Sequence, residues 1–304
     1  MSIFLGVDGG GTKTDYLLCV DNKHFKEKTN TIHLKQITRD EFSDNVTKAI
    51  NKLCDNAKIK IEDIDFSFLA IPGYGQYPEN EKFMEEFFDE FLGKGKYKMG
   101  NDCVNGWSGS LNAQAGINLV LGTGSIAFGV DDKGNSDRSG GWGPFLGDEA
   151  SAYFIGKNIL NLFTKMSDGR IEKTYIYELV KNELGIKDDV ELIDIAEKMK
   201  RDEIANCARL LNPALEKNDK YAIELLDKVG YEAALTIDSL INKLDFDGCV
   251  KVSYSGGVYK LGNKLIEAIE KHIKNNIEII EPYTTPIEGS LILAKKYYEK
   301  GAII

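Results

Sequence analysis

The sequence is short of proline, paired cysteines, basic charge and long apolar runs. Six prolines in 304 residues leave no Pro-rich low-complexity segment. The five cysteines form no Cys-x-x-Cys pair, which argues against both a disulfide framework and a zinc site. We therefore expect reduced, mostly buried thiols.

Basic residues are outnumbered, because 38 Lys and Arg against 48 Asp and Glu give a net charge of −10. Nucleic-acid binding requires clustered cations, so we expect no nucleic-acid partner, although an acidic protein can still bind one phosphate-bearing cofactor locally. No run of the sequence approaches the roughly 18 apolar residues of a membrane span, and the first residues lack the basic start of a signal peptide. These absences predict a cytoplasmic protein with no membrane partner.

Glycine is the residue in excess. Thirty glycines in 304 residues are about 10%, against roughly 7% in ordinary proteins, and many of them lie between predicted strands. A strand, the glycine turn 9–12 and a second strand form a predicted hairpin over 3–20. The same device recurs over 119–130 around the turn 122–125, and both copies end in Val-Asp-(Asn/Asp)-Lys. Such self-similarity predicts two related α/β lobes.

The remaining elements complete each lobe. Periodicity predicts helices over 39–58 and 79–92 around a strand over 66–71, a helical region over 148–244, a strand over 250–254, a glycine turn over 255–257 and helices over 261–274 and 287–300. We assign the N-terminal lobe to 1–115, joined by the C-terminal helix 287–304, and the C-terminal lobe to 116–286.

The first glycine turn does not fit the common nucleotide motifs. Gly6 and Gly11 have the separation of a Walker A loop, but Thr12 stands where the lysine should be and a strand follows. A Rossmann fingerprint opening a helix is also missing. A glycine hairpin can still bind phosphate through backbone N–H groups, with Thr12 adding a hydroxyl. One such turn alone is more simply explained as a tight hairpin. Two such turns, together with a third glycine turn, favour a site that binds a polyphosphate.

Four segments together resemble a known family. They are Asp-Gly-Gly-Gly-Thr-Lys-Thr (8–14), Gly-Thr-Gly-Ser (122–125), Gly-Gly-Trp-Gly (140–143) joined to Gly-Asp-Glu-Ala-Ser-Ala-Tyr (147–153), and Ser-Gly-Gly-Val (255–258). In this order they are similar to the N-acetylglucosamine kinases of the BadF/BadG/BcrA/BcrD-type ATPase family. The resemblance implies an α/β fold of two ribonuclease-H-like, actin-like ATPase lobes with an interlobe cleft that closes over ATP and sugar.

The resemblance also implies the nucleotide and metal contacts. Asp8 matches the acid that faces Mg²⁺, a role that suits a hard oxygen ligand; its alternative is the hairpin turn itself. The cofactor ATP would be held at its phosphates and adenosine by Gly10, Gly11, Thr12, Lys13, Gly122, Thr123, Gly124, Gly256 and Gly257. For the last two, a bare strand-to-helix turn is an equally good explanation from the sequence alone.

Asp102 matches the general base of these kinases. An alcohol that attacks a phosphorus atom must lose its proton, and a positioned carboxylate can take it. Asp102 also precedes a predicted helix, so it could instead be the N-cap, and both roles can coexist. The family motifs around it favour the base.

The sugar contacts implied by the resemblance are Asn30, Gly73, Asp102, Trp142, Gly143 and Asp148. An indole can lie against a pyranose face and a carboxylate can accept from two hydroxyls, although Trp142 could be core and Asp148 could cap a helix from Glu149. The stretch from Thr29 departs from the family, so either Asn30 supplies the sugar contact or the register places Ile32 there. His33 or Lys35 could then meet the carboxylate of a muramic-acid sugar, or lie in a solvated loop.

The function expected from these features is phosphorylation of the 6-hydroxyl of N-acetylglucosamine by ATP with Mg²⁺. N-acetylmuramic acid and glucosamine stay open as acceptors, and a homodimer is a family-based expectation. Two other classes are less favoured. An ATPase activator of a dehydratase would need closely placed thiolates for an iron–sulfur cluster, and a sugar sensor without turnover would not need Asp8 and Asp102.

Overall fold

The computed structural model describes residues 2–301, and the chain divides into two compact units. The first unit ends at Gln114 and is taken up again from Glu281, and the second is Ala115–Ile280. Each unit is built on a mixed five-stranded sheet. No helix among the described residues is long and apolar enough to cross a membrane.

The sheet of the first unit combines an antiparallel meander with two parallel strands. Its order is β3-β2-β1-β4-β5, in which β1–β2 and β2–β3 are antiparallel while β4 and β5 run parallel to β1. The bounds are β1 (Ile3–Gly9), β2 (Lys13–Val20), β3 (Lys23–Asn30), β4 (Phe66–Ala70) and β5 (Tyr97–Gly100). The predicted first hairpin is therefore present, and its glycine turn lies at the end of β1.

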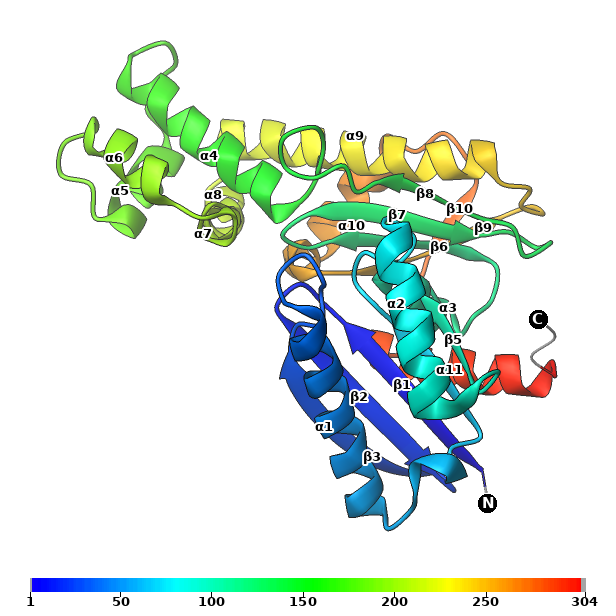
Figure 1. Cartoon of the computed structure of the whole chain (residues 1–304). Helices are drawn as coiled ribbons and strands as arrows, with labels where there is room; N and C mark the ends of the chain where they lie inside the picture. The colour runs from blue at the N-terminus through cyan, green and yellow to red at the C-terminus, as the bar shows by residue number, and fades with distance from the viewer. Residues whose placement is uncertain (1, 302–304) are drawn as a thin grey trace. The chain divides into compact units, whose positions relative to one another are not determined.

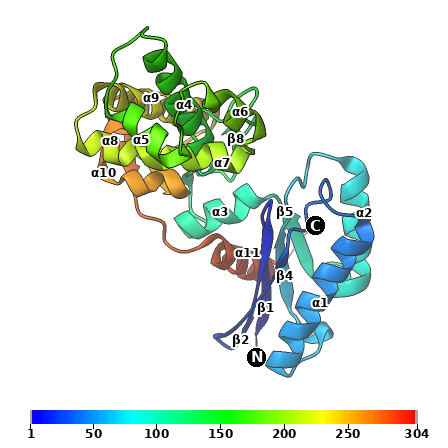
Figure 2. The same cartoon turned by 90° about the vertical axis from the view of Figure 1, so that its left-hand side faces the viewer.

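Helices cover both faces of this sheet. Figure 2 shows α1 (Arg39–Ala57) and α2 (Pro78–Phe88) on one face, and α3 (Asp102–Leu111) and α11 (Pro286–Glu299) on the other. The predicted helix over 79–92 ends as regular α-helix at Phe88 and continues as a π-helical turn to Gly93. A short 3₁₀ turn, Ile61–Asp63, precedes β4.

The sheet of the second unit repeats the first. Its order is β10-β9-β6-β7-β8, again with three antiparallel strands followed by two parallel ones. The bounds are β6 (Gly116–Leu121), β7 (Ser125–Val130), β8 (Ser136–Gly140), β9 (Val250–Ser255) and β10 (Ile277–Ile279). The prediction of two related α/β lobes is thus confirmed at the level of strand order.

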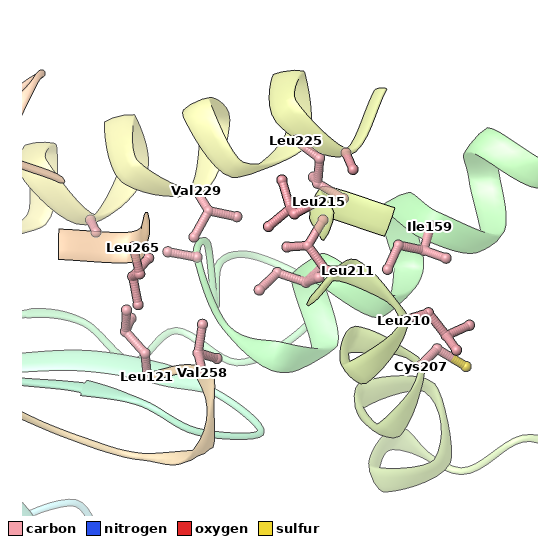
Figure 3. Packing of buried hydrophobic residues seen from close by; sticks show 14 of the residues in the cluster. Leu121, Ile159, Cys207, Leu210, Leu211, Leu215, Leu225, Val229, Val258 and Leu265 are labelled. Carbon is pink, nitrogen blue, oxygen red and sulfur yellow. The ribbon is translucent and has the colours of Figure 1, made fainter. Parts of the chain in front are cut away.

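The two units differ in the helices inserted after the third strand. The first has α1 there, whereas the second has α4 (Ala152–Ser167), α5 (Tyr175–Leu184), α6 (Glu191–Lys198), α7 (Arg201–Asn206), α8 (Leu211–Glu216) and α9 (Lys220–Lys243), with a 3₁₀ turn at Cys207–Leu210. Figure 1 shows α9 along one face of the second sheet. The buried side chains of α4, α8 and α9 meet there (Figure 3), so each of these helices turns an apolar face to the core.

The helix before the last is shorter than expected, whereas the last has the expected length. The helix predicted over 261–274 is α10 (Asn263–Glu270), preceded by a 3₁₀ turn at Gly257–Leu261. Gly262 separates the two with a φ of +63°, which interrupts helical backbone. α11 ends at Glu299 and contacts β1, β4 and α3; residues 302–304 of the range 287–304 lie outside the described residues.

The contact between α3 and α11 depends on two glycines. A Cβ atom added at Gly109 would lie 2.4 Å from the carbonyl oxygen of Thr285. One added at Gly289 would lie 2.2 Å from the carbonyl oxygen of Asn105. Since real side chains do not approach backbone this closely, the helices can cross at this distance because both positions lack a side chain.

Two serine hydroxyls fasten α11, one to α3 and the other to β1. Ser108 Oγ donates to the carbonyl oxygen of Gly289 at 3.0 Å, and Ser290 Oγ donates to that of Val7 at 2.9 Å. Both serines are buried, so each satisfies its own hydroxyl while it joins α11 to α3 or β1. The end of β1 and the start of α3 are thereby held against one helix.

Replacement of Gly289 by Ala should destabilise the protein by about 3 kcal/mol, because the added methyl has no space between the two helix backbones. Chemical denaturation followed by circular dichroism measures the free energy of unfolding. Asn51→Ala on the exposed side of α1 is the control and should change it by less than about 0.5 kcal/mol. Equal stability of the two variants would contradict the close packing of α3 and α11.

Candidate functional site

The glycine turn of the first unit is held at its base and open at its tip. The N–H of Gly10 donates to the carbonyl oxygen of Lys13 at 2.8 Å, and Thr31 Oγ1 donates to that of Gly10 at 2.7 Å. Gly11 and Thr12 are exposed. The turn therefore presents backbone and one hydroxyl to solvent, the groups that a phosphate-binding turn uses.

Asp8 lies beside this turn, at the end of β1. Its Oδ1 accepts from Nδ2 of Asn105 on α3 at 2.8 Å. Burial raises the pKa of Asp8, the hydrogen bond from Asn105 opposes that rise, and the negative charge of Asp102 adds to it. One carboxylate oxygen is thus fixed by the protein.

Asp102 is the first residue of α3 but does not cap it. Asn101 is the N-cap, and its Oδ1 accepts from the N–H of Cys103 at 3.0 Å. The alternative that Asp102 is the cap is therefore wrong. Asp102 is solvent-accessible, yet desolvation by the protein around its carboxylate raises the pKa above the ordinary value of 3.8. A carboxylate that is accessible, raised in pKa and not used as a cap suits a general base.

These residues also fit a magnesium ion. Mg²⁺ keeps several waters and takes one or two carboxylates together with substrate phosphates, rather than a full protein cage. No group of three or more His, Cys, Asp or Glu side chains that could hold a metal is present among the described residues. Asn105 Oδ1 is buried and has no hydrogen-bond partner within the described chain, so beside Asp8 it can accept from a water in the shell of the ion.

A loop next to the first turn holds the residues expected near the sugar. Asn30 is exposed at the end of β3, whereas Ile32 is fully buried in the core of the unit. The register that would place Ile32 at the sugar is therefore wrong. The His33 ring lies 3.3 Å from the position of a Cβ atom at Gly73, and the Lys35 ammonium lies 4.3 Å from the centre of the Tyr77 ring.

In the second unit, the turn Gly122–Ser125 is fastened to the start of α4. The N–H groups of Ala152 and Tyr153 donate to the carbonyl oxygens of Gly122 and Thr123 at 2.8 and 3.3 Å. Thr123 is exposed. A Cβ atom at Gly122 would meet nothing closer than the Gly124 carbonyl oxygen at 3.9 Å among the described residues, so this side of the turn is open to a ligand.

The third glycine turn packs directly on the first strand of its sheet. Gly256 has a φ of +105°, and a Cβ atom there would lie 2.4 Å from the carbonyl oxygen of Leu121. At Gly257 a Cβ atom would have no described neighbour within 4 Å. Leu121 and Val258 are neighbours in the buried core of this unit (Figure 3). The backbone conformation and the close contact with Leu121 require glycine at position 256, whereas at position 257 there is open space for a side chain or a ligand.

A cavity of about 560 Å³ lies between these two turns and the helical region, all within the second unit. Its volume is in the range of a cofactor site. Its walls combine apolar side chains with a few polar ones. The lining residues are Gly122, Thr123, Ala152, Ile155, Asp202, Ala205, Asn206, Ala208, Arg209, Asn212, Gly257, Val258, Lys260 and Leu261.

Some of the residues that the sequence assigns to a nucleotide line this cavity. Gly122, Thr123 and Gly257 line it, as predicted residues of the nucleotide site. The charged and amide residues from α7 to α8, such as Asp202 and Asn206, were missed, because that stretch has only the charge pattern of a solvated helix. The arrangement can hold a polar, partly flat molecule against backbone N–H groups.

Trp142 lies on an exposed loop rather than in the core. Its side chain is 65% exposed, and the Arg138 guanidinium lies 5.0 Å from the centre of its ring. The core alternative for Trp142 is therefore wrong. Gly140, Gly141 and Gly143 have φ values of +78°, +74° and +82°, a conformation that favours glycine and shapes this loop.

Asp148 is buried beside the turn Gly122–Ser125 and does not cap α4. Ser151 is the N-cap of α4, and its Oγ accepts from the N–H of Phe154 at 3.1 Å. The helix therefore starts at Ala152, not Glu149, and the cap alternative for Asp148 is wrong. The Asp148 side chain is 3% exposed and forms an ion pair with Arg201.

Comparison with known proteins places the chain among ATPases. Residues 5–294 match the model of the BadF/BadG/BcrA/BcrD ATPase family. The N-acetylmuramic acid/N-acetylglucosamine kinase of Clostridium acetobutylicum is 27% identical over 308 residues, which cover 97% of this chain and 99% of that protein. The N-acetyl-D-glucosamine kinase of Dictyostelium discoideum is 28% identical over 316 residues, which cover 96% and 97%.

A solved structure shows the same fold. A protein from Chromobacterium violaceum, assigned as an N-acetylglucosamine kinase, superposes with a TM-score of 0.75 at 23% identity and covers 96% of this chain and 99% of its own. With the strand order repeated in both units, this likeness confirms the predicted actin-like ATPase fold.

Two neighbouring glycines should respond differently to the same change. Gly256→Ala should lower the free energy of unfolding by about 1–3 kcal/mol, because alanine at a φ of +105° is strained and meets the Leu121 carbonyl. Gly257→Ala is the matched control and should leave it unchanged, since its Cβ enters open space. Thermal and chemical unfolding of both variants measure this; a larger loss at position 257 would contradict the turn geometry.

Proposed function

Because the chain belongs to the BadF/BadG/BcrA/BcrD ATPase family, we propose that it is an ATP-dependent kinase for the 6-hydroxyl of an N-acetylated amino sugar. N-acetylglucosamine is the expected acceptor, supported by the names of the two relatives. The observation that carries the kinase activity is Asp102, an accessible carboxylate with a raised pKa that is free of the capping role. A plain ATPase has no need of a base for an alcohol.

The nucleotide has a candidate place on the second unit. The cavity beside Gly122, Thr123 and Gly257 would take the adenosine side of ATP, with Gly256 shaping the turn and Gly124 completing the phosphate turn. On the first unit, the residues proposed for phosphate contacts are those of its own turn, namely Gly10, Gly11, Thr12 and Lys13. In this assignment the open tips of the turns meet phosphate oxygens through backbone N–H groups, which suits glycine at these positions.

The chemical step follows from the assignment of Asp102. Its carboxylate accepts the proton of the sugar 6-hydroxyl while that oxygen bonds to the γ-phosphorus and the bond from this phosphorus to the bridging oxygen of ADP breaks. Asp8, oriented by Asn105, would hold Mg²⁺, which neutralises charge on the phosphate oxygens when bound. The products are the sugar 6-phosphate and ADP, and the proton stays on Asp102 until water takes it.

The sugar contacts proposed from the sequence differ in exposure, from the exposed Asn30 and Trp142 to the buried Asp148. Asn30 and Gly73 lie on the first unit, and Trp142, Gly143 and Asp148 on the second. The exposed Trp142 indole offers a flat face for a pyranose ring. Asp148 could accept from sugar hydroxyls only after exchanging part of its contact with Arg201.

N-acetylmuramic acid is a second candidate acceptor, supported by the name of one relative and by the side chains of one loop. The Clostridium acetobutylicum protein is named for both sugars. Near Gly73, the Lys35 ammonium and the partly buried His33 could meet a lactyl carboxylate. Burial and the charge of Lys35 lower the pKa of His33, and an anionic ligand beside the ring would raise it. Glucosamine and the dehydratase-activator role have no such support.

A coupled assay of ADP release across sugars tests the proposal. N-acetylglucosamine should give the highest kcat/KM among glucose, glucosamine, N-acetylglucosamine, N-acetylmannosamine and N-acetylmuramic acid. Because polar contacts to the acetamido group would be left unpaired without it, we expect glucose to be at least about 10-fold poorer. ADP release at the same rate without any sugar would point to a plain ATPase, and release with none of the five would defeat the kinase assignment.

Replacement of Asp102 by Asn should lower kcat by about 10²–10⁴-fold with the protein still folded. In the wild type, kcat/KM should fall on acidification, because the base of the free enzyme must be deprotonated. Since the pKa of Asp102 is raised, this fall should occur above the range of an ordinary aspartate. Cys103→Ala is the control and should retain both kcat and the acid limb. Near wild-type turnover by the Asn variant at saturating sugar would refute the assignment.

A further inference from the structure

Arg201 and Asp148 form an ion pair at the turn Gly122–Ser125. Arg201 begins α7, and its Nη2 lies 2.5 Å from Oδ2 of Asp148. The Asp148 side chain is 3% exposed, whereas that of Arg201 is 46% exposed. A carboxylate so deeply buried requires a compensating charge, and α7 supplies one from 53 residues further along the chain.

The pair lies directly on the backbone of the turn. A Cβ atom at Gly124 would be 2.6 Å from Nη2 of Arg201 and 3.0 Å from both carboxylate oxygens of Asp148. The φ of Gly124 is not positive, so its conformation does not call for glycine. Gly124 is therefore explained by the approach of the ion pair rather than by backbone freedom.

Asp148 also bonds to the turn itself. Its Oδ1 accepts from the N–H of Ser125, at 3.4 Å, while Oδ2 accepts from Arg201. The backbone at Asp148 is in the left-handed region with a φ of +58°, which carries a cost that the surrounding contacts must offset. One carboxylate thus links the turn to the start of α7.

The far end of this linkage faces the cavity. Asp202, which follows Arg201, lines the cavity together with Gly122 and Thr123. Loss of the ion pair would therefore release both the turn and the first residues of α7, and both segments line the cavity. Thr123, the hydroxyl expected at the phosphates, lies next to Gly124.

We propose that Arg201 is a positioning residue for nucleotide binding: its ion pair with buried Asp148 holds the turn Gly122–Ser125 in the form that receives the phosphates. The inference rests on the proposed use of this turn for ATP. It assigns Arg201 no contact with the phosphates, because its guanidinium is engaged by Asp148. It also gives Asp148 a role at the turn that is separate from any contact with sugar.

The test is direct ADP binding by isothermal titration calorimetry in the absence of sugar. Arg201→Met and Asp148→Asn should each weaken ADP binding by about 10-fold, because a displaced turn misplaces its donors. The double variant should bind no more weakly than either single one, since both remove the same interaction. Arg201→Lys should recover part of the affinity. The KM for sugar should rise in Asp148→Asn, because that change alters a proposed sugar contact.

The matched control is Arg170→Met, which breaks an exposed ion pair with Asp168 in the same unit and should leave ADP affinity unchanged. Melting temperatures identify any unfolded variant. Because the double variant buries no unpaired charge, it can be measured even if one of the single variants does not fold. If Arg201→Met loses affinity while Asp148→Asn does not, Arg201 contacts the phosphates itself and the proposal fails. Unchanged affinity in both variants also refutes it. Wild-type protein that binds no ADP would instead refute the proposed function.

Discussion

The crossing of α3 and α11 is the constraint on which the first unit depends. Backbone meets backbone at Gly109 and Gly289, where no side chain has space. This crossing brings Asn105 to a place where its amide donates both to Asp8 and to the carbonyl oxygen of Pro286. The C-terminal helix, α3 and the end of β1 are therefore one packing unit, and the two candidate acids lie on it.

The glycines at the candidate sites serve three different physical purposes. Gly256 has a backbone conformation that other residues rarely adopt, whereas Gly124 leaves space for an ion pair. Gly122 and Gly257 have open space in front of them, where a ligand can approach the backbone. A glycine can therefore be present because of backbone strain, close packing or ligand access, and the structure shows which reason applies at each position.

Much of the fold was readable from the sequence because its signals are local. A glycine turn between two apolar strands specifies a hairpin from neighbouring residues, and its recurrence at 122–125 predicted the repeated sheet. Asn105 was within reach of the same reasoning, since it lies one helical turn after Asp102. Arg201 was not, because nothing near it in the sequence indicates a partner 53 residues away. The exposure of Trp142 likewise depends on how its loop leaves the sheet.

The central claim is that this chain transfers a phosphoryl group to the 6-hydroxyl of an amino sugar. Its most direct test is the ³¹P–¹H correlation spectrum of the product formed from ATP and N-acetylglucosamine. The account predicts one sugar phosphate whose phosphorus couples to the two protons on C6. Coupling to the anomeric proton, or ADP and inorganic phosphate with no sugar phosphate, would contradict it.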